Sequence, residues 1–383
     1  MKAFENIHLY PTPFTNETRV LRVTKSLVEL GFFNSILVVA SFLDESTSKE
    51  EQLDKNRSVL RIKSINKNGG FLAKLIYFCV WYFKVLLKVD GKKLKCINAH
   101  SISVLPLGVL MKIIYKARLV YDAHEIETET QEVKGIRRLF SKIIERLLVR
   151  YADIVILTSQ GHADWYSKEY DNLDIKVVRN CPYIQNPKEE NKDIFRNKFG
   201  ISKNELIFIY QGALSKPRGV DLILNSFKEA DKKKHIVFMG FGDLVTEIKH
   251  YSSSYPNIHF HEAVHPDRVF EYTRCADVGI HMMDDSCKNH LYALPNKPME
   301  YMNSGLASIV TNLPTMGELI HSANSGWLLE PNDEEGLKNL VNSLTISEIE
   351  EASLSALLWS ESNNWETEEI ILRDIYKSLL FNY

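Results

Sequence analysis

Short strand-like segments alternate with helical segments along most of the sequence, and many of these strands are apolar on both faces. NSILVVASF and ADIVILTS in the first half, and LIFIYQG and HIVFMGFG in the second, contain few polar residues. A strand without a polar face belongs in a parallel sheet that helices cover on both sides. The alternation therefore predicts a doubly wound α/β architecture.

The alternation stops once, near the middle of the chain. The stretch KVVRNCPYIQNPKEENKDIF is rich in charges and carries two prolines, and the 383 residues exceed what one hydrophobic core usually serves. We predict a Rossmann-like N-terminal domain at 1–180, a linker at 181–200 and a second Rossmann-like domain at 201–360. Residues 361–383 are expected to form a C-terminal helix, for which packing against the first domain is one option.

Composition narrows the class of protein. The net charge of −2 gives no basis for general nucleic-acid binding, and the five cysteines form no C-x-x-C pair that would suggest zinc. The longest apolar run, Leu75 to Leu87, is interrupted by Lys84 and falls short of the roughly 20 residues of a membrane span. The opening MKAFENIHLYPTPF lacks the apolar region of a signal peptide. We therefore expect a cytoplasmic protein, either soluble or bound to a membrane surface.

Two glycine-containing segments follow strands of the second domain. In open α/β sheets, ligands bind at the carboxyl ends of the strands. In YQGALSKPRGVDLIL a strand ends at Gly212, and Arg218 and Gly219 precede a helix, which is a favourable place for an anion. In FMGFGDL, Gly240 and Gly242 stand at another strand end. The alternatives are an ordinary loop with surface charges and a plain tight turn.

A third segment, NHLYALPNKPMEYMNSG, predicts a helix that starts after Pro295 and ends at a turn around Gly305. Lys297 and Glu300 are three residues apart, so both side chains lie on one face of that helix. A cation suits a phosphate, and a carboxylate suits a pair of hydroxyl groups. The alternative is a salt bridge between the two.

A fourth segment, VYDAHEIETE in the first domain, places His124 directly after a strand and beside carboxylates. A histidine in this position serves as a metal ligand, as a base, or simply as a hydrogen-bonded loop residue. The residues alone leave these three options open.

Taken together, the motifs LVYDAHE, VVRNCP, IYQGALSKPRG, FMGFG, YALPNKPMEYMNSGLASIVTNLP and GWLLEPND resemble a GT-B glycosyltransferase of the large retaining family four. They run in the expected order from about Asn98 to Asp333. The resemblance implies two Rossmann-like domains facing a cleft. It also implies an enzyme that moves a sugar from a nucleotide-diphosphate donor, held by the second domain, to an acceptor held mostly by the first.

The resemblance assigns roles to individual residues. Glu300 matches a glutamate that binds the nucleotide ribose, Arg218 a basic residue that clamps the diphosphate, and His124 a histidine close to the donor sugar. Together they are the expected catalytic residues. The full donor-binding set is Gly212, Arg218, Gly219, Gly240, Gly242, Tyr292, Pro295, Asn296, Lys297 and Glu300. On the acceptor side we expect Thr15, Asn16, His100 and His124.

The sequence departs from the family pattern at two positions. Many members carry a second glutamate eight positions before the first, where this chain has Tyr292. Many also carry arginine after the first glycine, where this chain has Ala213. These differences leave the donor sugar open. No Asp-x-Asp follows a strand, so we expect no metal and no cofactor besides the donor substrate.

Two alternatives to a transferase stay open, the first of them suggested by the missing glutamate. One is a non-catalytic GT-B protein that binds a sugar nucleotide or a partner enzyme, and the other is a GT-B sugar-nucleotide epimerase. For the transferase, we expect a glycan or lipid-linked glycan as acceptor and a role in capsule or O-antigen-like cell-surface polysaccharide synthesis, with retention of configuration.

The region between residues 71 and 150 is basic, with 15 Lys and Arg against 7 Asp and Glu. YFCVWYFKVLLKVDGKKLK joins aromatic residues to lysines, and KGIRRLFSKIIERLLVR forms a basic amphipathic helix. Such segments favour the anionic inner face of a cell membrane. The alternative is that both helices pack their apolar faces on the sheet.

Overall fold

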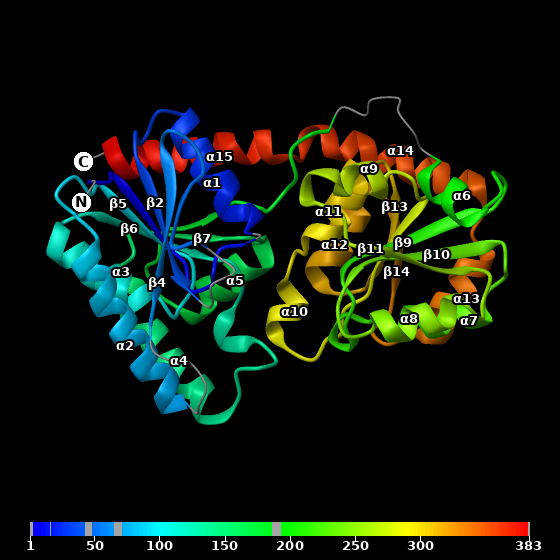
Figure 1. The fold of residues 1–383 in the computed structure, drawn as a ribbon, viewed down its shortest axis with the longest axis horizontal. Helices are drawn as coiled ribbons and strands as arrows, with labels where there is room; N and C mark the ends of the chain where they lie inside the picture. Colours follow the sequence, from blue (N-terminus) through cyan, green and yellow to red (C-terminus); the bar gives the residue numbers. More distant parts are fainter. Residues whose placement is uncertain (1–2, 16, 43–47, 65–70, 186–192, 382–383) are drawn as a thin grey trace. The chain divides into compact units, whose positions relative to one another are not determined.

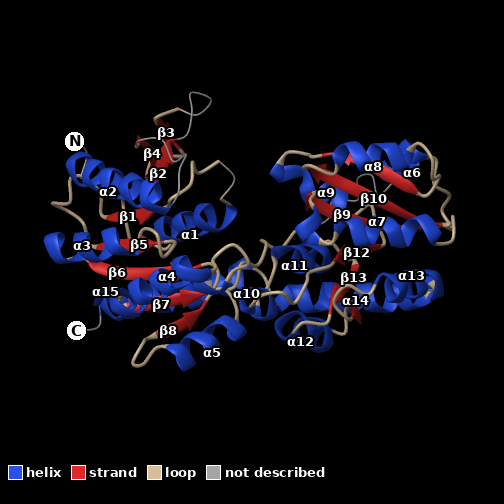
Figure 2. Cartoon of the chain, turned by 90° about the horizontal axis from the view of Figure 1, so that it is seen from below, coloured by secondary structure: helices blue, strands red, loops and turns tan. Residues whose placement is uncertain are grey.

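The computed structural model describes residues 3–15, 17–42, 48–64, 71–185 and 193–381. The chain divides into two compact units, the first made of Met1–Arg179 with Glu369–Tyr383 and the second of Asn180–Glu368. Each unit contains a parallel sheet with helices on both faces, as the alternating sequence predicts (Figures 1 and 2). Whether the two sheets face a common cleft stays a prediction.

The sheet of the first unit has the order β3-β4-β2-β1-β5-β6-β7-β8, which Figure 2 shows as a stack of strands. Every neighbouring pair is parallel except β3 and β4, an antiparallel pair that the sequence pattern missed. The strands are β1 (Asn6–Leu9), β2 (Ile36–Phe42), β3 (Glu50–Gln52), β4 (Arg57–Lys63), β5 (Cys96–Ala99), β6 (Arg118–Ala123), β7 (Ile154–Leu157) and β8 (Ile175–Val177).

Helices cover both faces of this sheet, with α2, α3 and α4 along one side in Figure 1 and α1 and α15 along the other. The helices that belong to the unit are α1 (Thr18–Glu29), α2 (Phe71–Lys88), α3 (Leu105–Tyr115), α4 (Gly135–Leu148), α5 (Gln160–Glu169) and most of α15 (Trp365–Phe381). The 3-10 turns are η1 (Glu127–Glu129) and η2 (Val149–Tyr151).

The second unit has a six-stranded sheet, entirely parallel, in the order β11-β10-β9-β12-β13-β14. Its strands are β9 (Leu206–Ala213), β10 (Lys234–Phe241), β11 (Ile258–Glu262), β12 (Val278–His281), β13 (Ala307–Thr311) and β14 (Gly326–Leu329). Its helices are α6 (Ile194–Phe199), η3 (Lys216–Arg218), α7 (Val220–Glu229), α8 (Val245–Ser252), η4 (Pro266–Arg268), α9 (Val269–Thr273), α10 (Lys288–Tyr292), α11 (Asn296–Asn303), α12 (Pro314–Ala323), α13 (Glu334–Ser343) and α14 (Ile346–Ser362).

The second unit begins earlier than the predicted linker at 181–200 allows. Cys181 is buried against Met299, and Phe195 of α6 is buried with Ile207 in the core of this unit. At the other end, α15 reaches the first unit, where the buried Tyr376 accepts a hydrogen bond from Asn98. Part of the predicted linker is therefore a component of the second unit, because its apolar residues have a core to enter.

The loop after β1 leads directly into α1. The helix begins at Thr18 with Glu17 in the cap position, and Asn16 lies outside the described residues. Glu17 accepts hydrogen bonds from Tyr10 Oη at 2.8 Å and Thr12 Oγ1 at 2.9 Å. The carboxylate thus ties the loop after β1 to the helix.

Among the described residues, no helix has both the length and the apolarity needed to cross a membrane. This agrees with the short, lysine-interrupted apolar run in the sequence.

Candidate functional site

The predicted donor residues Lys297 and Glu300 lie on α11 of the second unit, which starts directly after Pro295 as expected. They do not pair with each other, as the alternative interpretation required. Lys297 Nζ instead donates to Tyr210 Oη at 2.9 Å, and Glu300 Oε2 accepts from Gln211 Nε2 at 2.8 Å. The end of β9 therefore fixes both side chains of one helical turn.

Glycine is required where β9 and β10 end side by side. A Cβ atom on Gly240 would lie 1.8 Å from the carbonyl oxygen of Gly212, which no side chain can tolerate. Gly212 itself has a φ of +110°, and a Cβ atom there would lie 3.2 Å from Lys297 Cε. Gly242 follows β10, and Gly219 joins η3 to α7. Because Gly212 and Gly240 have no side chains, the backbone at the ends of β9 and β10 stays uncovered beside Lys297.

Positive charge gathers at this strand end. Burial, followed by the neighbouring charge of Arg218, lowers the pKa of Lys297 to about 7. Burial also raises the pKa of Tyr210, its hydrogen-bond partner, to about 12. A lysine whose charged form is disfavoured gains stability from an anion. These residues therefore favour a negatively charged ligand.

His281, at the end of β12, was missed by the sequence analysis. Its side chain is buried, and neither ring nitrogen has a hydrogen-bond partner among the described residues. Burial, then the charges of Lys297 and Arg218, holds the pKa of His281 well below its ordinary value. Residues two apart in a strand face the same side of the sheet. Gly279, two residues before His281, packs on Tyr301 of α11, so His281 lies on that side as well.

Tyr292 is the last residue of α10, whereas Glu300 lies on the next helix, α11. The carbonyl oxygen of Tyr292 accepts from Thr315 Oγ1 at 3.1 Å. Asn296 Oδ1 accepts from Asn180 Nδ2 at 2.7 Å, which holds the first residue of α11. Pro295 and Asn296 thus set the start of the helix, and a contact from Tyr292 to a sugar stays a prediction.

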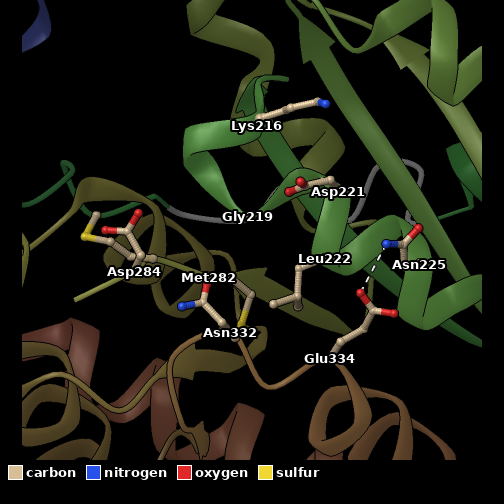
Figure 3. A pocket seen from close by; sticks show the side chains of 10 residues that line it. Lys216, Gly219, Asp221, Leu222, Asn225, Met282, Asp284, Asn332 and Glu334 are labelled. Atoms are coloured by element: carbon tan, nitrogen blue, oxygen red, sulfur yellow. Dashed lines mark hydrogen bonds between the residues drawn. The ribbon is translucent and has the colours of Figure 1, made fainter. Parts of the chain in front are cut away.

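A separate hollow of about 300 Å³ lies beside the start of α7 (Figure 3). Of the predicted donor residues, Gly219 lines it. The carboxylates of Asp221, Asp284 and Glu334 also line it, with Lys216 as the accompanying cation. Three carboxylates repel a diphosphate, so this hollow suits an anionic ligand less well than the strand end that carries Lys297.

In the first unit, the ends of β1, β5 and β6 form the floor of a hollow of about 840 Å³. The predicted acceptor-side residues His100 and His124 line it, together with Tyr10 and Thr12 from the loop after β1. Thr15 is exposed and is not among the lining residues. Two of the four acceptor-side predictions thus meet in one hollow.

Three histidines, His124, His100 and His8, form a chain of side chains that starts at the hollow. His124 Nε2 lies 3.1 Å from His100 Nδ1, and His100 Nε2 lies 2.8 Å from His8 Nδ1. His8 Nε2 in turn lies 2.7 Å from Asn6 Oδ1. Burial lowers the pKa of both His8 and His100, so these two rings are neutral at pH 7. His8 and Asn6 were not singled out from the sequence.

Asp122 ties this chain to α1. Arg19 Nη2 donates to Asp122 Oδ1 at 2.8 Å, and both side chains are buried. Burial alone would raise the pKa of Asp122, but Arg19 and hydrogen bonds from His100 and His124 outweigh it and hold the pKa well below its usual range.

The ligand atoms of His100, Asp122 and His124 lie within 4.8 Å of one another, close enough for a metal ion to bridge them. Arg19 already neutralises Asp122, and His100 is hydrogen-bonded to His8. A divalent cation would have to displace or repel the guanidinium. The spacing of these three side chains permits a metal ion, but their ion pair with Arg19 and hydrogen bond to His8 fit a metal poorly.

Glu127 is a further carboxylate that lines the hollow, and it lies within the VYDAHEIETE segment without having been singled out. It accepts a hydrogen bond from the backbone N–H of Ile102 at 2.8 Å. Burial, with the nearby charges of Glu145 and Glu125, raises the pKa of Glu127 to about 8. Its carboxyl group is therefore mostly protonated at pH 7 and can donate to a ligand hydroxyl.

Comparison with known proteins places these sites in context. Residues 205–346 match the model of the family described as glycosyl transferases group 1. This range contains the residues around Lys297, namely Tyr210, Gln211, Gly212, Arg218, His281 and Glu300.

Relatives cover the whole chain at low identity. The chitobiosyldiphosphodolichol beta-mannosyltransferase of Kluyveromyces lactis is 22% identical over 403 residues, which cover 94% of this chain and 87% of the relative. The sucrose-phosphate synthase of Thermosynechococcus elongatus superimposes with a TM-score of 0.78 at 13% identity, covering 98% and 99% of the two chains. Anabaena HepE in complex with UDP-glucose gives a TM-score of 0.74 at 15% identity, covering 98% and 100%. The chain therefore has the GT-B fold, and its second unit matches the glycosyl transferases group 1 family over residues 205–346.

Proposed function

We propose that this enzyme moves a sugar from a nucleoside-diphosphate sugar to a glycan or lipid-linked glycan acceptor, with retention of configuration. The pathway we propose is the assembly of a cell-surface polysaccharide such as a capsule or O antigen. The observation that carries the proposal is that Lys297 and Glu300 lie on one turn of α11 and that each is hydrogen-bonded to a different residue of β9.

The proposed donor site divides the nucleotide between these groups. Glu300 accepts hydrogen bonds from the ribose hydroxyls, and Lys297 and Arg218 bind the diphosphate. Burial leaves Lys297 with a pKa of about 7, and a bound phosphate stabilises its ammonium form. His281, buried and without a partner among the described residues, is a further group that a phosphate or hydroxyl would satisfy. HepE, whose complex with UDP-glucose has the same fold, supports a nucleotide-sugar donor.

The proposed reaction is a front-face displacement through an oxocarbenium-like state. The bond between the sugar and the diphosphate breaks as Lys297 and Arg218 stabilise the negative charge that develops on the leaving group. The leaving phosphate oxygen takes the proton of the acceptor hydroxyl, and the new glycosidic bond forms on the same face. His124 is proposed to orient the donor sugar. The identity of the sugar is left open by Tyr292, which stands where many family members have glutamate.

We propose that no metal and no other cofactor takes part. Lys297 and Arg218 supply the charge that a divalent ion would otherwise provide. Asp284, a possible metal ligand, already contacts His290 at 2.7 Å. A chelator should leave the turnover rate unchanged. Activity that disappears with chelator and returns with magnesium or manganese contradicts this.

The proposed location is the inner face of the cell membrane. In α4, Glu145 is the one buried residue, and it accepts hydrogen bonds from Tyr121, Tyr166 and Tyr170. Most apolar residues of this helix are exposed, including Ile136 at 80%. An exposed apolar helix face with basic neighbours favours an anionic bilayer. The name of the mannosyltransferase relative, which describes a sugar on diphosphodolichol, supports a lipid-linked acceptor.

The test is a screen of nucleoside diphosphates and sugar nucleotides by thermal shift, followed by product analysis with the donor that binds. A ligand that binds only the native state raises the melting temperature. We expect release of a nucleoside diphosphate together with a glycosylated acceptor or free sugar. Binding without turnover supports a non-catalytic protein instead, and an epimerised sugar supports an epimerase.

A further inference from the structure

The hollow of the first unit is built from two kinds of surface. Its floor is polar, because His100, His124 and Ser101 follow β5 and β6. Its walls are contributed by α2 and α4 and are largely apolar. The wall residues include Leu75, Phe78, Phe140, Ile144 and Leu148. A volume of about 840 Å³ is ample for one small ligand.

The apolar walls continue onto the molecular surface. Leu75 of α2 and Phe140 of α4 line the hollow and are also 40% and 36% exposed. Next to them in the chain, Ile76 and Leu139 are exposed large apolar residues. The hollow therefore opens onto α2 and α4 where both helices expose apolar residues, and α4 is the helix that we propose to contact a membrane.

Charged groups also line the hollow. Lys74 comes from α2 and Arg137 from α4, so each wall contributes one cation. Glu125 and Glu127 are the carboxylates that line it, and the pKa of Glu127, raised by burial to about 8, keeps that group mostly neutral at pH 7. An anionic group is thus favoured near the helices more than a cationic one.

We propose that this hollow binds the acceptor as an amphiphile, with its apolar chain between α2 and α4, its phosphate at Lys74 and Arg137, and its sugar hydroxyls on the floor. The inference rests on the proposed function and specifies the acceptor as a sugar linked through phosphate to a lipid. A membrane phospholipid would use the walls and the cations but not the histidine floor.

A matched pair of substitutions on α4 tests the wall. Ile144 lines the hollow, whereas its neighbour Ile143 is exposed and does not. Ile144→Trp fills the space between the helices, and Ile143→Trp adds the same side chain outside it. We expect Ile144→Trp to raise the KM for a long-chain sugar phosphate at least tenfold and to leave the KM for a short-chain analogue unchanged. Ile143→Trp should alter neither value.

A binding measurement separates this inference from the proposed function, because it needs no turnover. Dodecyl phosphate below its micelle concentration should raise the melting temperature of the wild type and of Ile143→Trp, but not of Ile144→Trp. Inorganic phosphate, which can bind the cations of the second unit but has no apolar chain, should shift the melting temperature of all three proteins equally. Equal binding of dodecyl phosphate to both variants overturns the inference, even if sugar transfer is observed. Failure of transfer with every donor overturns the proposed function, even if dodecyl phosphate binds.

Equal KM values for long-chain and short-chain acceptors in the wild type also overturn the inference. So does a response to vesicles of anionic phospholipid, but not to dodecyl phosphate, since the walls would then serve the membrane alone. Unchanged nucleoside-diphosphate affinity and an unchanged far-ultraviolet circular dichroism spectrum in Ile144→Trp show that the variant is folded.

Discussion

The two strand-end sites of this molecule satisfy their charges in opposite ways. Beneath the hollow of the first unit, Asp122 is paired with Arg19, and the histidines bond to one another. In the second unit, the cations Lys297 and Arg218 lie near His281, which has no hydrogen-bond partner in the described part of the chain, and Lys297 donates to a neutral tyrosine oxygen. The first site is electrostatically complete on its own, whereas the second gains its counter-charge from a ligand.

This difference indicates a division of labour. A site that is complete before binding offers a fixed surface for hydroxyl groups and stays in place without a ligand. A site with unneutralised cations binds an anion strongly, because the ligand removes an electrostatic cost that folding has left. The predictions below test this contrast and the proposed membrane contact, from the largest expected effect to the smallest.

Arg19→Met should destabilise the first unit by about 3–5 kcal/mol, because it leaves Asp122 as an unpaired buried charge. Urea unfolding measures the loss. Arg22→Met on the same helix is the control, since Arg22 makes its hydrogen bonds locally to Thr18 at the surface. Lys297→Met should not destabilise the second unit, because it removes a buried cation that lacks an anionic hydrogen-bond partner. Equal losses for Arg19→Met and Arg22→Met would contradict the contrast.

Glu300→Ala should weaken nucleoside-diphosphate binding by about 1.5–3 kcal/mol, or roughly tenfold to a hundredfold, if its carboxylate binds the ribose. Isothermal titration calorimetry with the nucleotide found by the thermal screen measures this. Glu318→Ala on α12 is the matched control, because that glutamate is exposed. Wild-type affinity and turnover in Glu300→Ala would remove the ribose assignment.

The pH dependence of diphosphate binding should report on Lys297. Its pKa falls from 10.5 to about 7 in the folded protein, and a phosphate raises it again, so binding takes up a proton. Affinity should therefore drop by up to about tenfold per pH unit above pH 7. Lys297→Arg keeps its charge and should flatten the profile. A profile of the same slope in both proteins would show that another group titrates.

The same shift affects stability. The unfolded chain binds more protons than the folded one between the folded pKa of about 7 and the unfolded value of 10.5. The contribution of Lys297 to the free energy of unfolding therefore rises with pH across this window, and it should be missing in Lys297→Met.

The smallest effect concerns the membrane. Lys88→Ala at the end of α2 should reduce binding to anionic vesicles about fivefold, from roughly 1 kcal/mol per basic residue at the surface. Cosedimentation at low salt measures it, with the exposed Lys233→Ala of the second unit as control. Recovery of the wild type in the supernatant with both anionic and neutral vesicles would remove the proposed membrane contact.

The sequence allowed a large part of this fold to be predicted, since the apolar strands and the helix after Pro295 follow from local rules. The histidine chain did not follow from those rules. It needs β1 beside β5, which brings His8 next to His100 across 92 positions of sequence. Local patterns do not specify which strands are neighbours.

The exposure of α4 was equally hidden. Its spacing of apolar residues is the same whether the helix packs on the sheet or faces outward, so the sequence left both options open. The deciding residue is Glu145, whose three tyrosine partners come from β6 and from α5 and its end. A polar anchor of this kind holds the helix without using its apolar face, and the pattern of hydrophobic residues does not report it.

The histidine chain also has a direction. The Asn6 amide nitrogen donates to Cys96 O and Asn98 Oδ1, so its Oδ1 must accept from His8 Nε2–H. The neutral His8 then accepts at Nδ1 from His100 Nε2–H. His100 Nδ1 faces both His124 Nε2 at 3.1 Å and Asp122 Oδ2 at 3.2 Å. One side-chain amide thus fixes the tautomer of His8 and the nitrogen at which His100 donates to it. Because an amide oxygen is a very weak base, no proton leaves the chain through Asn6, and the carboxylate of Asp122 is a group beside the rings that can stabilise positive charge on them.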